Sequence, residues 1–483
     1  MGIVQNQTFK NTITTYLGFG IGAVNILFLF TYFLTDEYHG LVAFVLSSAN
    51  IMMPLFALGA HNAIIKFYST FKTRNNINSF LTIMLILPLA FIIPIGSIGW
   101  LCYDYIAELL SKKNAIIENY VWLIFVTAAC FSYFEIFYAW AKVQMQSVFG
   151  NLMKEVFPRV GVLFLFLFIY LNWISVETFI FGVVIVYAIR TVIMMFYAFS
   201  IKSPVLRLGK IPNLSSIIKY ALLIIIAGSV GSIILEIDKF MIGELKAIEN
   251  VAYYGVAIYI ASVIGVPSRS MLQITNPITA KLLNDNDKVG LNILYKKSSL
   301  NLFIISGLIF LLIVLNINQL YELIPEKFSG GLLVVFVVGI AKLADNISGN
   351  NNAILFNSDY YRVVLVLGVL LAIITVILNL ALIPQYGING AAFATFISIV
   401  VYNASKLWFV YYKFKMLPFT INSAKTLVLI LVLIGVFYFW DFPFHPIIGI
   451  AFKSILITSC YVFVVYTLRF SEDISGVIDK FIK

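Results

Sequence analysis

Residues 296–317 read KKSSLNLFIISGLIFLLIVLNI. After the lysine pair, the stretch from Ser298 to Ile317 contains no charged side chain, and most of its residues are leucine, isoleucine, valine or phenylalanine. About 20 apolar residues are enough for a helix to cross a bilayer, and a helix satisfies its backbone polar groups within the segment. This stretch therefore predicts a transmembrane helix with a basic pair at one end.

The same pattern recurs along the whole chain. Hydrophobic residues make up 61% of the 483 positions and charged residues only 11%, with a mean hydropathy of +0.98. This charge content is roughly half that of an average soluble domain, so we expect an all-α integral membrane protein with about 14 transmembrane helices. The predicted spans are residues 13–34, 40–64, 80–101, 117–140, 156–172, 177–200, 218–242, 251–273, 298–317, 331–356, 363–383, 391–410, 424–440 and 447–468.

Lysine and arginine are confined almost entirely to every second gap between these spans. Of the 32 Lys and Arg residues, 22 lie in the two tails, in the even-numbered loops or at their margins, and six lie inside spans. The other loops hold only Lys112, Lys113, Lys246 and Lys327. The positive-inside rule therefore predicts that both termini are cytoplasmic and that the number of spans is even. The formal net charge of +10 then reflects topology and attraction to anionic lipids, and no nucleic-acid partner is expected.

The sequence contains none of the patterns typical of catalytic or metal sites that we considered. Cys102, Cys130 and Cys460 are far apart and form no C-x-x-C pair, and the three histidines are equally isolated. A glycine-rich phosphate loop, a G-x-S-x-G elbow and an H-E-x-x-H motif are all missing from the sequence. We therefore expect no enzyme, no catalytic residue and no bound metal or cofactor.

A weak internal repeat indicates two similar halves. The segment from Tyr38 to Phe44 opens the second span and is followed by Pro54; the segment from Tyr254 to Tyr259 opens the eighth span and is followed by Pro267. Repeated halves with a site between them are a common plan in transporters, although such openings can also recur by chance in apolar sequence. The predicted division is an N-terminal lobe at 1–210, a C-terminal lobe at 211–415 and a final helix pair with its tail at 416–483.

Four stretches resemble the polysaccharide (O-antigen, Wzx-like) flippases of the MOP exporter superfamily. The first is TDEYHGLVAFVLSSANIMMPLFALGAHNAIIKFY, from Thr35 to Tyr68. The second is IDKFMIG, from Ile237 to Gly243, together with the segment that begins YYGVA at Tyr253 and runs to Pro267. The third is NSDYYR, from Asn357 to Arg362. The most specific is LNLALIPQYGINGAAFATFIS, from Leu378 to Ser398, because its LIP-x-YG-I-x-GAA turn lies between the eleventh and twelfth spans, as in the family.

This resemblance implies two six-helix lobes around a central cavity, with a C-terminal helix pair appended. It implies a protein of the bacterial cytoplasmic membrane that moves a lipid-linked oligosaccharide from the inner to the outer leaflet by alternating access. The implied partners are that substrate, membrane lipids and other polysaccharide assembly proteins; transport is coupled to H⁺ or Na⁺, if to any ion. Because a sugar chain and its pyrophosphate cannot cross hydrocarbon unaided, the cavity is expected to be polar and cationic.

Charged residues inside the spans are the candidates for this cavity, since an ionisable group at bilayer depth costs at least about 2.5 kcal/mol and tends to face a cavity or a partner. Arg190 and Lys342 lie near the middle of the sixth and tenth spans, and Arg269 follows Pro267 in the eighth. We predict that these three contact phosphate. Lys342 could instead pair with Asp345 three residues later, and Arg269 could simply mark the cytoplasmic side.

The acids and the remaining lysines are weaker candidates. Glu135 has no partner three or four positions away, Asp238 is the freer acid of its cluster, and Asp345 follows Lys342; these are the predicted ion or coupling residues. Lys239, Lys66 and Lys406 are predicted as secondary cavity or gate residues. Pairing of Lys239 with Glu236 and extension of Lys406 to the membrane surface are the structural alternatives.

Two other functions were weighed. A MATE-like multidrug antiporter of the same superfamily should carry an acid in the cavity of its first lobe, whereas the first two spans here contain none in their apolar cores. A membrane-embedded polymerase or ligase should carry a large outer loop, whereas the longest predicted outer gap is the short stretch from Leu101 to Val121. An anionic, lipid-linked substrate is therefore favoured.

Overall fold

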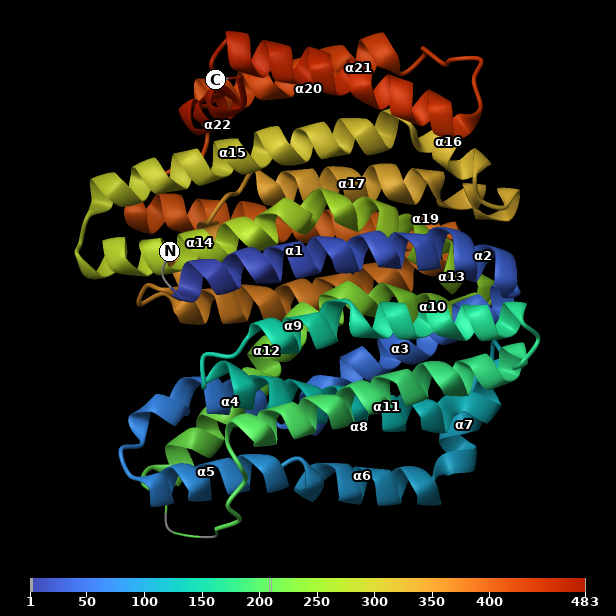
Figure 1. Ribbon diagram of the computed structural model, residues 1–483, viewed down its shortest axis with the longest axis vertical. Coiled ribbons are helices and arrows are strands. Elements are labelled where there is room, and N and C mark those ends of the chain that lie inside the picture. Colours follow the sequence, from blue (N-terminus) through green and yellow to red (C-terminus); the bar gives the residue numbers. More distant parts are fainter. Residues whose placement is uncertain (1–2, 208, 210, 483) are drawn as a thin grey trace. The chain divides into compact units, whose positions relative to one another are not determined.

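The computed structural model describes residues 3–207, 209 and 211–482, and this part of the chain contains helices and no β-strand (Figure 1). The expected all-α membrane architecture is confirmed. Contacts divide the chain into two compact units, Met1–Gly255 and Val256–Lys483. The predicted lobes at 1–210 and 211–415 and the helix pair at 416–483 stay a prediction, and Lys210, at the first of these boundaries, lies outside the described residues.

The N-terminal unit consists of sequential helices with short connections. Its elements are α1 (Ile3–Ala23), the π-helical η1 (Val24–Leu29), α2 (Phe30–Phe33), α3 (Asp36–Ala57), α4 (Ala60–Phe67), η2 (Tyr68–Thr70), α5 (Arg74–Ile86), α6 (Leu89–Leu101), α7 (Tyr103–Ser111), η3 (Ala115–Tyr120), α8 (Val121–Lys142), α9 (Val148–Glu155), α10 (Phe157–Tyr170), α11 (Val176–Ile201) and α12 (Leu214–Leu245). Helix α13 (Glu249–Ser262) crosses the boundary into the second unit.

The C-terminal unit continues in the same way. Its elements are η4 (Val263–Gly265), α14 (Val266–Asn284), α15 (Lys288–Leu315), α16 (Ile317–Glu322), η5 (Glu326–Gly331), α17 (Leu332–Asn346), α18 (Asn351–Phe356), α19 (Tyr361–Phe414), α20 (Ile421–Phe437), α21 (Pro446–Thr467) and α22 (Glu472–Ile482).

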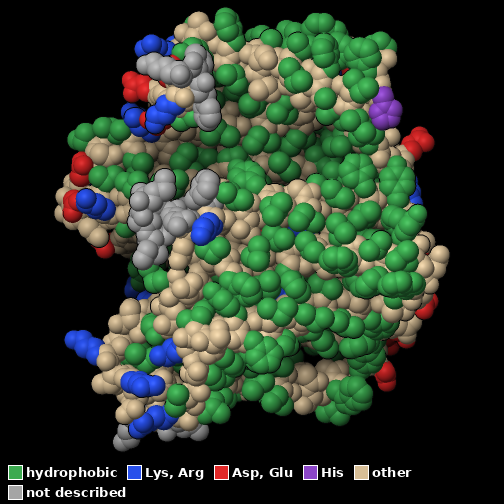
Figure 2. Space-filling view, in the orientation of Figure 1, with side chains coloured by type: hydrophobic (Ala, Val, Ile, Leu, Met, Phe, Trp, Pro, Cys, Tyr) green, Lys and Arg blue, Asp and Glu red, His purple; other side chains and the backbone are tan. Residues whose placement is uncertain are grey.

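Ten helical stretches among the described residues are long and apolar enough to cross a membrane. One of them, α19, contains both the eleventh and the twelfth predicted span, and α20 is a shorter apolar helix. Hydrophobic side chains cover most of the visible surface, and within each unit most of the visible Lys and Arg lie toward one edge (Figure 2). The chain is therefore a multi-pass membrane protein, while the count of fourteen spans stays a prediction.

The LIP-x-YG-I-x-GAA motif forms a sharp turn inside α19. Gly387 has φ of 57° and ψ of −134°, which is not helical and is strained for any residue with a side chain. A Cβ atom added at Gly390 would lie 2.3 Å from the carbonyl oxygen of Leu382. In a straight helix, eight residues would separate these positions by about 12 Å along the axis. The chain therefore folds back at this motif, which explains why both glycines are needed.

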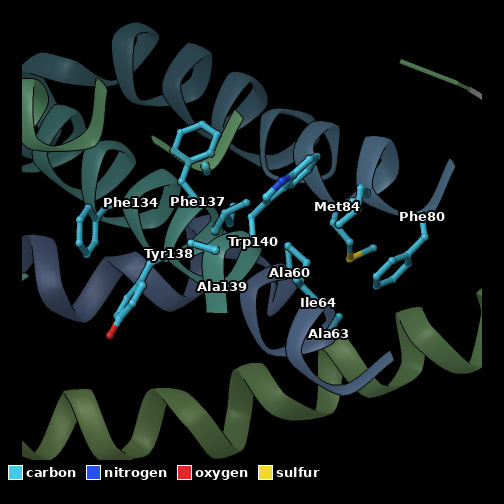
Figure 3. Packing of buried hydrophobic residues seen from close by; sticks show 14 of the residues in the cluster. Ala60, Ala63, Ile64, Phe80, Met84, Phe134, Phe137, Tyr138, Ala139 and Trp140 are labelled. Atoms are coloured by element: carbon cyan, nitrogen blue, oxygen red, sulfur yellow. The ribbon is translucent and has the colours of Figure 1, made fainter. Parts of the chain in front are cut away.

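The N-terminal unit is held together around α8. Aromatic residues of α8, including Phe134, Phe137 and Trp140, pack with small and apolar residues of α4 and α5 such as Ala63 and Met84 (Figure 3). Helices α3 and α11 also pack against α8, and α12 packs against α3. This packing fixes α8 and α11 side by side, which positions the buried charge described below.

Close glycine contacts bring α12 against α3. A Cβ atom at Gly40 would lie 2.1 Å from the carbonyl oxygen of Ile248, and one at Gly243 would lie 2.4 Å from the Phe44 ring. These approaches leave no room for side chains at the two glycines. The segment just after α12 therefore lies against the backbone of α3 at Gly40, and α12 lies against the Phe44 ring at Gly243. The glycine that opens the second span is thus required for packing.

Asn114, between α7 and η3, joins the end of α12 to the rest of the N-terminal unit. Its amide nitrogen donates to the carbonyl oxygens of Gly243 (2.6 Å) and Lys246 (3.0 Å), and its amide oxygen accepts from the backbone nitrogen of Ile248 (2.8 Å). The side chain is only 8% exposed. It therefore pairs three backbone groups at the point where α12 ends.

We expect Asn114→Ala to lower the melting temperature by several degrees, because buried backbone groups left without partners cost about 1–3 kcal/mol each. Thermal unfolding in detergent checks this. Asn250→Ala is the matched control, since that amide donates only to the nearby Ala247 carbonyl. Equal melting temperatures for the two variants would show that the three bonds contribute little.

The C-terminal unit has its core where α15 meets α20 and α21, which lie beside it in Figure 1. Phe303, Phe310 and Leu311 of α15 pack with Ile430 of α20 and Tyr461 of α21. The Tyr461 hydroxyl also donates to the Ile304 carbonyl at 2.9 Å. The last two apolar helices are therefore part of this unit's core as well as of its lipid-facing surface.

Candidate functional site

Arg190 lies in the middle of α11 and is enclosed by aromatic rings. Its guanidinium carbon lies 4.0 Å from the ring centre of Phe134, 4.8 Å from that of Tyr187 and 5.2 Å from that of Phe131. Phe131 and Phe134 belong to α8, which packs against α11. The side chain is 6% exposed. A guanidinium over desolvated rings gains about 2 kcal/mol, so this box holds the cation in place.

Arg190 forms no ion pair in the part of the chain that the structure describes. No carboxylate there lies within 4 Å of the guanidinium, and Nε is buried without a hydrogen-bond partner. A buried ion without a partner is costly, and the rings offset only part of this cost. An anion that reached the guanidinium would supply the missing ion pair.

Glu135 of α8 is paired with a lysine that sequence reasoning did not identify. Lys154 of α9 donates to its carboxylate at 2.5 Å, and the two side chains are 15% and 43% exposed. The two residues are nineteen positions apart, so no helical spacing indicated the pair. Whether Glu135 also takes part in ion coupling stays a prediction.

The acids near the end of α12 are also engaged. Glu236 accepts from Lys239 at 2.7 Å, which confirms the pairing that their spacing suggested, and from the Ser47 hydroxyl of α3 at 2.9 Å. Asp238 is 4% exposed and accepts from the Tyr254 hydroxyl at 2.6 Å. These contacts join α12 to α3 and α13.

Lys66 lies near the end of α4 and is exposed. Its ammonium nitrogen is 3.8 Å from the ring centre of Tyr220 on α12. This cation–π contact lies apart from the Arg190 box, and the sequence could not have predicted it because it joins helices far apart in the chain.

In the C-terminal unit, the helix is broken close to Pro267. The 3₁₀ turn η4 separates α13 from α14 directly before this proline. Asn346 of α17 donates to the buried backbone at this break, its amide nitrogen lying 2.8 Å from the Ile264 carbonyl. The break is therefore held by a specific contact from α17.

Two predicted phosphate contacts lie at this break. Arg269 is exposed in the first turn of α14, and the side chain of Lys342 runs along η4, because a Cβ added at Gly265 would lie 3.7 Å from Lys342 Cδ. Asp345, the predicted partner of Lys342, is exposed on α17. Arg269 thus lies just after the helix break, and Lys342 reaches the same break from α17.

Lys406 is enclosed within the C-terminal unit and is only 1% exposed, so it does not extend to the surface. Its ammonium donates to the Asn352 amide oxygen at 3.0 Å and lies 4.0 Å from the ring centre of Tyr402. Like Arg190, it is a buried cation held by polar and aromatic groups, with no carboxylate within 4 Å among the described residues.

The asparagine-rich segment around α18 was missed by sequence reasoning. Asn350 donates to the Thr279 hydroxyl at 2.9 Å, and Asn351 donates to the Tyr295 hydroxyl at 3.0 Å. The available signal was the run Asn350, Asn351 and Asn352 in an apolar chain, because buried amides there must find partners. This segment joins α18 to α14 and α15 through polar contacts.

Comparison with known proteins identifies the same fold in several transporters. The MatE family matches residues 224–327, less than half of the chain. The lipid II flippase MurJ in an inward closed conformation is 14% identical, with 95% of this chain and 99% of that chain covered and a TM-score of 0.74. An inward-facing multidrug resistance MATE transporter of the MOP superfamily is 14% identical, with 86% and 95% covered and a TM-score of 0.59.

A third similar structure is a MOP superfamily transporter from Pyrococcus furiosus, described as having a binding pocket of reverse polarity that suggests a different function. It is 13% identical, with 87% of this chain and 98% of that chain covered and a TM-score of 0.57. No curated protein matches the chain in sequence. The chain therefore has the fold of the MOP transporters, and the MatE match supports membership of that superfamily.

Proposed function

We propose that this protein is a flippase for a polyprenyl-pyrophosphate-linked oligosaccharide. It moves this substrate from the inner to the outer leaflet of a bacterial cytoplasmic membrane by alternating access, for the synthesis of a cell-surface polysaccharide of the O-antigen type. Both termini are cytoplasmic in this proposal. The observation that supports it most is the buried Arg190, which forms no ion pair with the described residues.

The chemistry of such a substrate fits the arrangement of charge. The polyprenyl tail can remain in lipid, whereas the pyrophosphate needs cations that replace its hydration. Arg190 offers a guanidinium, whose planar donors suit phosphate oxygens, in the N-terminal unit. In the C-terminal unit, Arg269 and Lys342 lie near the helix break and are proposed as further phosphate contacts.

A multidrug antiporter with the same fold is the alternative, and it would need an acid available for an organic cation. In the described part of the N-terminal unit, three acids of the predicted fourth and seventh spans already have partners. Glu135 is paired with Lys154, Glu236 with Lys239, and Asp238 accepts from Tyr254. This pattern favours an anionic substrate.

Binding by the purified full-length protein in nanodiscs separates the two functions. One probe is a short-chain polyprenyl pyrophosphate carrying a disaccharide, and the other is tetraphenylphosphonium, an organic cation. We expect saturable binding of the pyrophosphate that weakens as salt is raised, and no saturable binding of the cation. Binding of the cation alone would reject the flippase and favour the antiporter.

We propose that coupling to H⁺ or Na⁺ uses Glu135. If a bound ion replaced the Lys154 ammonium as the partner of this carboxylate, α9 would be released from α8, and ion binding would be linked to helix movement. We expect Glu135→Gln to remove stimulation by an ion gradient, so that flipping falls to the rate without a gradient. Flipping in proteoliposomes with and without a pH or sodium gradient measures this.

Glu155→Gln is the matched control, since Glu155 is also paired, with Arg159 at 3.0 Å, and is equally 15% exposed. This variant should keep the stimulation. If Glu135→Gln also keeps it, Glu135 has only a structural role.

A further inference from the structure

A pocket of about 440 Å³ lies between α14 and α18 in the C-terminal unit. Its walls include three asparagines, Asn276, Asn352 and Asn357, together with the apolar side chains of Phe356 and Pro277. Its size is within the range of pockets that bind small molecules, and a few polar groups in an apolar wall are typical of such sites. The proposed phosphate contacts at Arg190, Arg269 and Lys342 give these three asparagines no role.

The buried lysine fixes the orientation of one amide. An ammonium group can only donate hydrogen bonds, so the Asn352 atom that Lys406 contacts at 3.0 Å must be the carbonyl oxygen. The amide NH₂ of Asn352 is therefore the group left to act in the pocket, as a donor. Lys406 is 1% exposed, so it acts on the pocket through Asn352 and leaves the pocket itself without a charge.

The other two amides complement this donor. The Asn357 amide nitrogen donates to the Ala353 carbonyl at 2.8 Å, which leaves its carbonyl oxygen as an acceptor. Asn276 is exposed and makes no hydrogen bond to the described residues, so it offers both a donor and an acceptor. The pocket thus presents neutral donors and acceptors in one place.

These groups suit a sugar better than other ligands. A hydroxyl group both donates and accepts, as the amides do, and the apolar C–H face of a sugar ring can lie against Phe356, which is 51% exposed. No Asp, Glu, Lys or Arg lines the pocket, which argues against a metal, a free phosphate or an organic cation. An apolar ligand would leave the three amides without partners, at a cost of about 1–3 kcal/mol each.

The pocket also lies in line with a proposed phosphate contact. Arg269, Leu272 and Asn276 are spaced three and four residues apart on α14, so they share one face of the helix. Arg269 and Asn276 are separated by about 10 Å along its axis. The pocket follows the predicted eighth span and precedes the eleventh, at two loops that the lysine distribution assigns to the cytoplasm. A substrate held by its pyrophosphate at Arg269 could place its sugars here.

We infer that this pocket is a saccharide subsite, which binds the sugars of the lipid-linked substrate on the cytoplasmic side before they cross. The inference rests on the proposed flippase function. It assigns Asn276, Asn352 and Asn357 to hydrogen bonding with sugar hydroxyls, and Phe356 to contact with the ring face. Lys406 is a positioning residue that orients Asn352.

The test compares two probes on the full-length protein in nanodiscs. One is a short-chain polyprenyl pyrophosphate without sugar, and the other is the same lipid carrying each saccharide of a di- to tetrasaccharide panel. For the wild type, we expect at least one saccharide to tighten binding relative to the bare lipid. Asn276→Ala and Asn352→Asp should each weaken the affinity for the saccharide-bearing lipid by about tenfold, which corresponds to the loss of one hydrogen bond. Both variants should bind the bare lipid with unchanged affinity.

Asn352→Asp is informative because it keeps the shape and an oxygen for Lys406 but removes the NH₂ donor. Asn284→Ala is the matched control, since Asn284 is exposed on the same helix outside the pocket, and it should bind every probe as the wild type does. Three results would overturn the subsite. One is that no saccharide tightens wild-type binding. The others are that both pocket variants bind the saccharide lipids as the wild type does, or that both lose binding of the bare lipid as well. Failure of the bare lipid pyrophosphate to bind the wild type would instead reject the proposed function.

Discussion

Replacement of Arg190 by methionine is expected to abolish flipping while making the protein more stable. Methionine has a similar length and fills the box of Phe131, Phe134 and Tyr187 without a charge. Replacing buried charges with well-packed apolar residues is often neutral or stabilising, by up to about 1–4 kcal/mol. Loss of the charge-assisted bonds to phosphate should weaken binding of a polyprenyl pyrophosphate by about 10- to 100-fold. Melting temperature and binding affinity are measured on the same preparations.

Arg159→Met is the matched control for this trade-off. The Arg159 guanidinium is paired with the Glu155 carboxylate at 3.0 Å, so its loss leaves a carboxylate without its partner. We expect this variant to be less stable than the wild type and to bind the pyrophosphate normally. If Arg190→Met melts at a lower temperature and still binds substrate, Arg190 stabilises the fold and has no role in recognition.

Substitution of Gly390 by alanine is expected to damage the C-terminal unit severely. The added Cβ would lie 2.3 Å from the Leu382 carbonyl oxygen and 2.5 Å from its carbon, both of which are backbone atoms that cannot rotate away. Overpacking of this kind costs about 1–3 kcal/mol or more, and here it opens the turn at which α19 folds back. We expect a melting temperature lowered by several degrees and a large loss of monodisperse protein in size-exclusion chromatography.

The control for Gly390 is Gly435→Ala in α20. No heavy atom lies within 4 Å of a Cβ added at Gly435, and the residue is inside a helix, where alanine is favoured over glycine by about 0.5–1 kcal/mol. This variant should be as stable as the wild type or slightly more stable. Equal behaviour of Gly390→Ala and Gly435→Ala would show that the turn tolerates a side chain.

The fold could be predicted largely because each helix that crosses the lipid needs about 20 apolar residues, which are easily seen in the sequence. Apolar length alone identified helices such as α15, and the motif around Gly387 predicted the turn within α19. The breaks within spans were less visible. The π-helical η1 had no signal in the sequence, whereas η4 lies close to Pro267. The hydrogen bond from Asn346 to Ile264 that holds η4 comes from another helix, so no local pattern encodes it.

The candidate site was predicted only in part, for a similar reason. Arg190 was found because a charge in an apolar segment is rare, and Tyr187 is one turn away, but Phe131 and Phe134 reach it from another helix. Lys406 lies near the end of a predicted span, yet packing against Asn352 buries it. Contacts between helices decide which charged side chains are buried, so the spacing of residues within one helix could not predict it.

Flipping by the purified wild-type protein tests the central claim most directly. The protein is reconstituted in liposomes with a fluorescent polyprenyl-pyrophosphate oligosaccharide in both leaflets, and a membrane-impermeant quencher or glycosidase reports the accessible fraction. We predict that wild-type protein makes the entire pool accessible within minutes, and that Arg190→Met leaves only the outer half accessible, as in protein-free liposomes. Wild-type liposomes that behave as protein-free ones, while taking up an organic cation, would contradict the account.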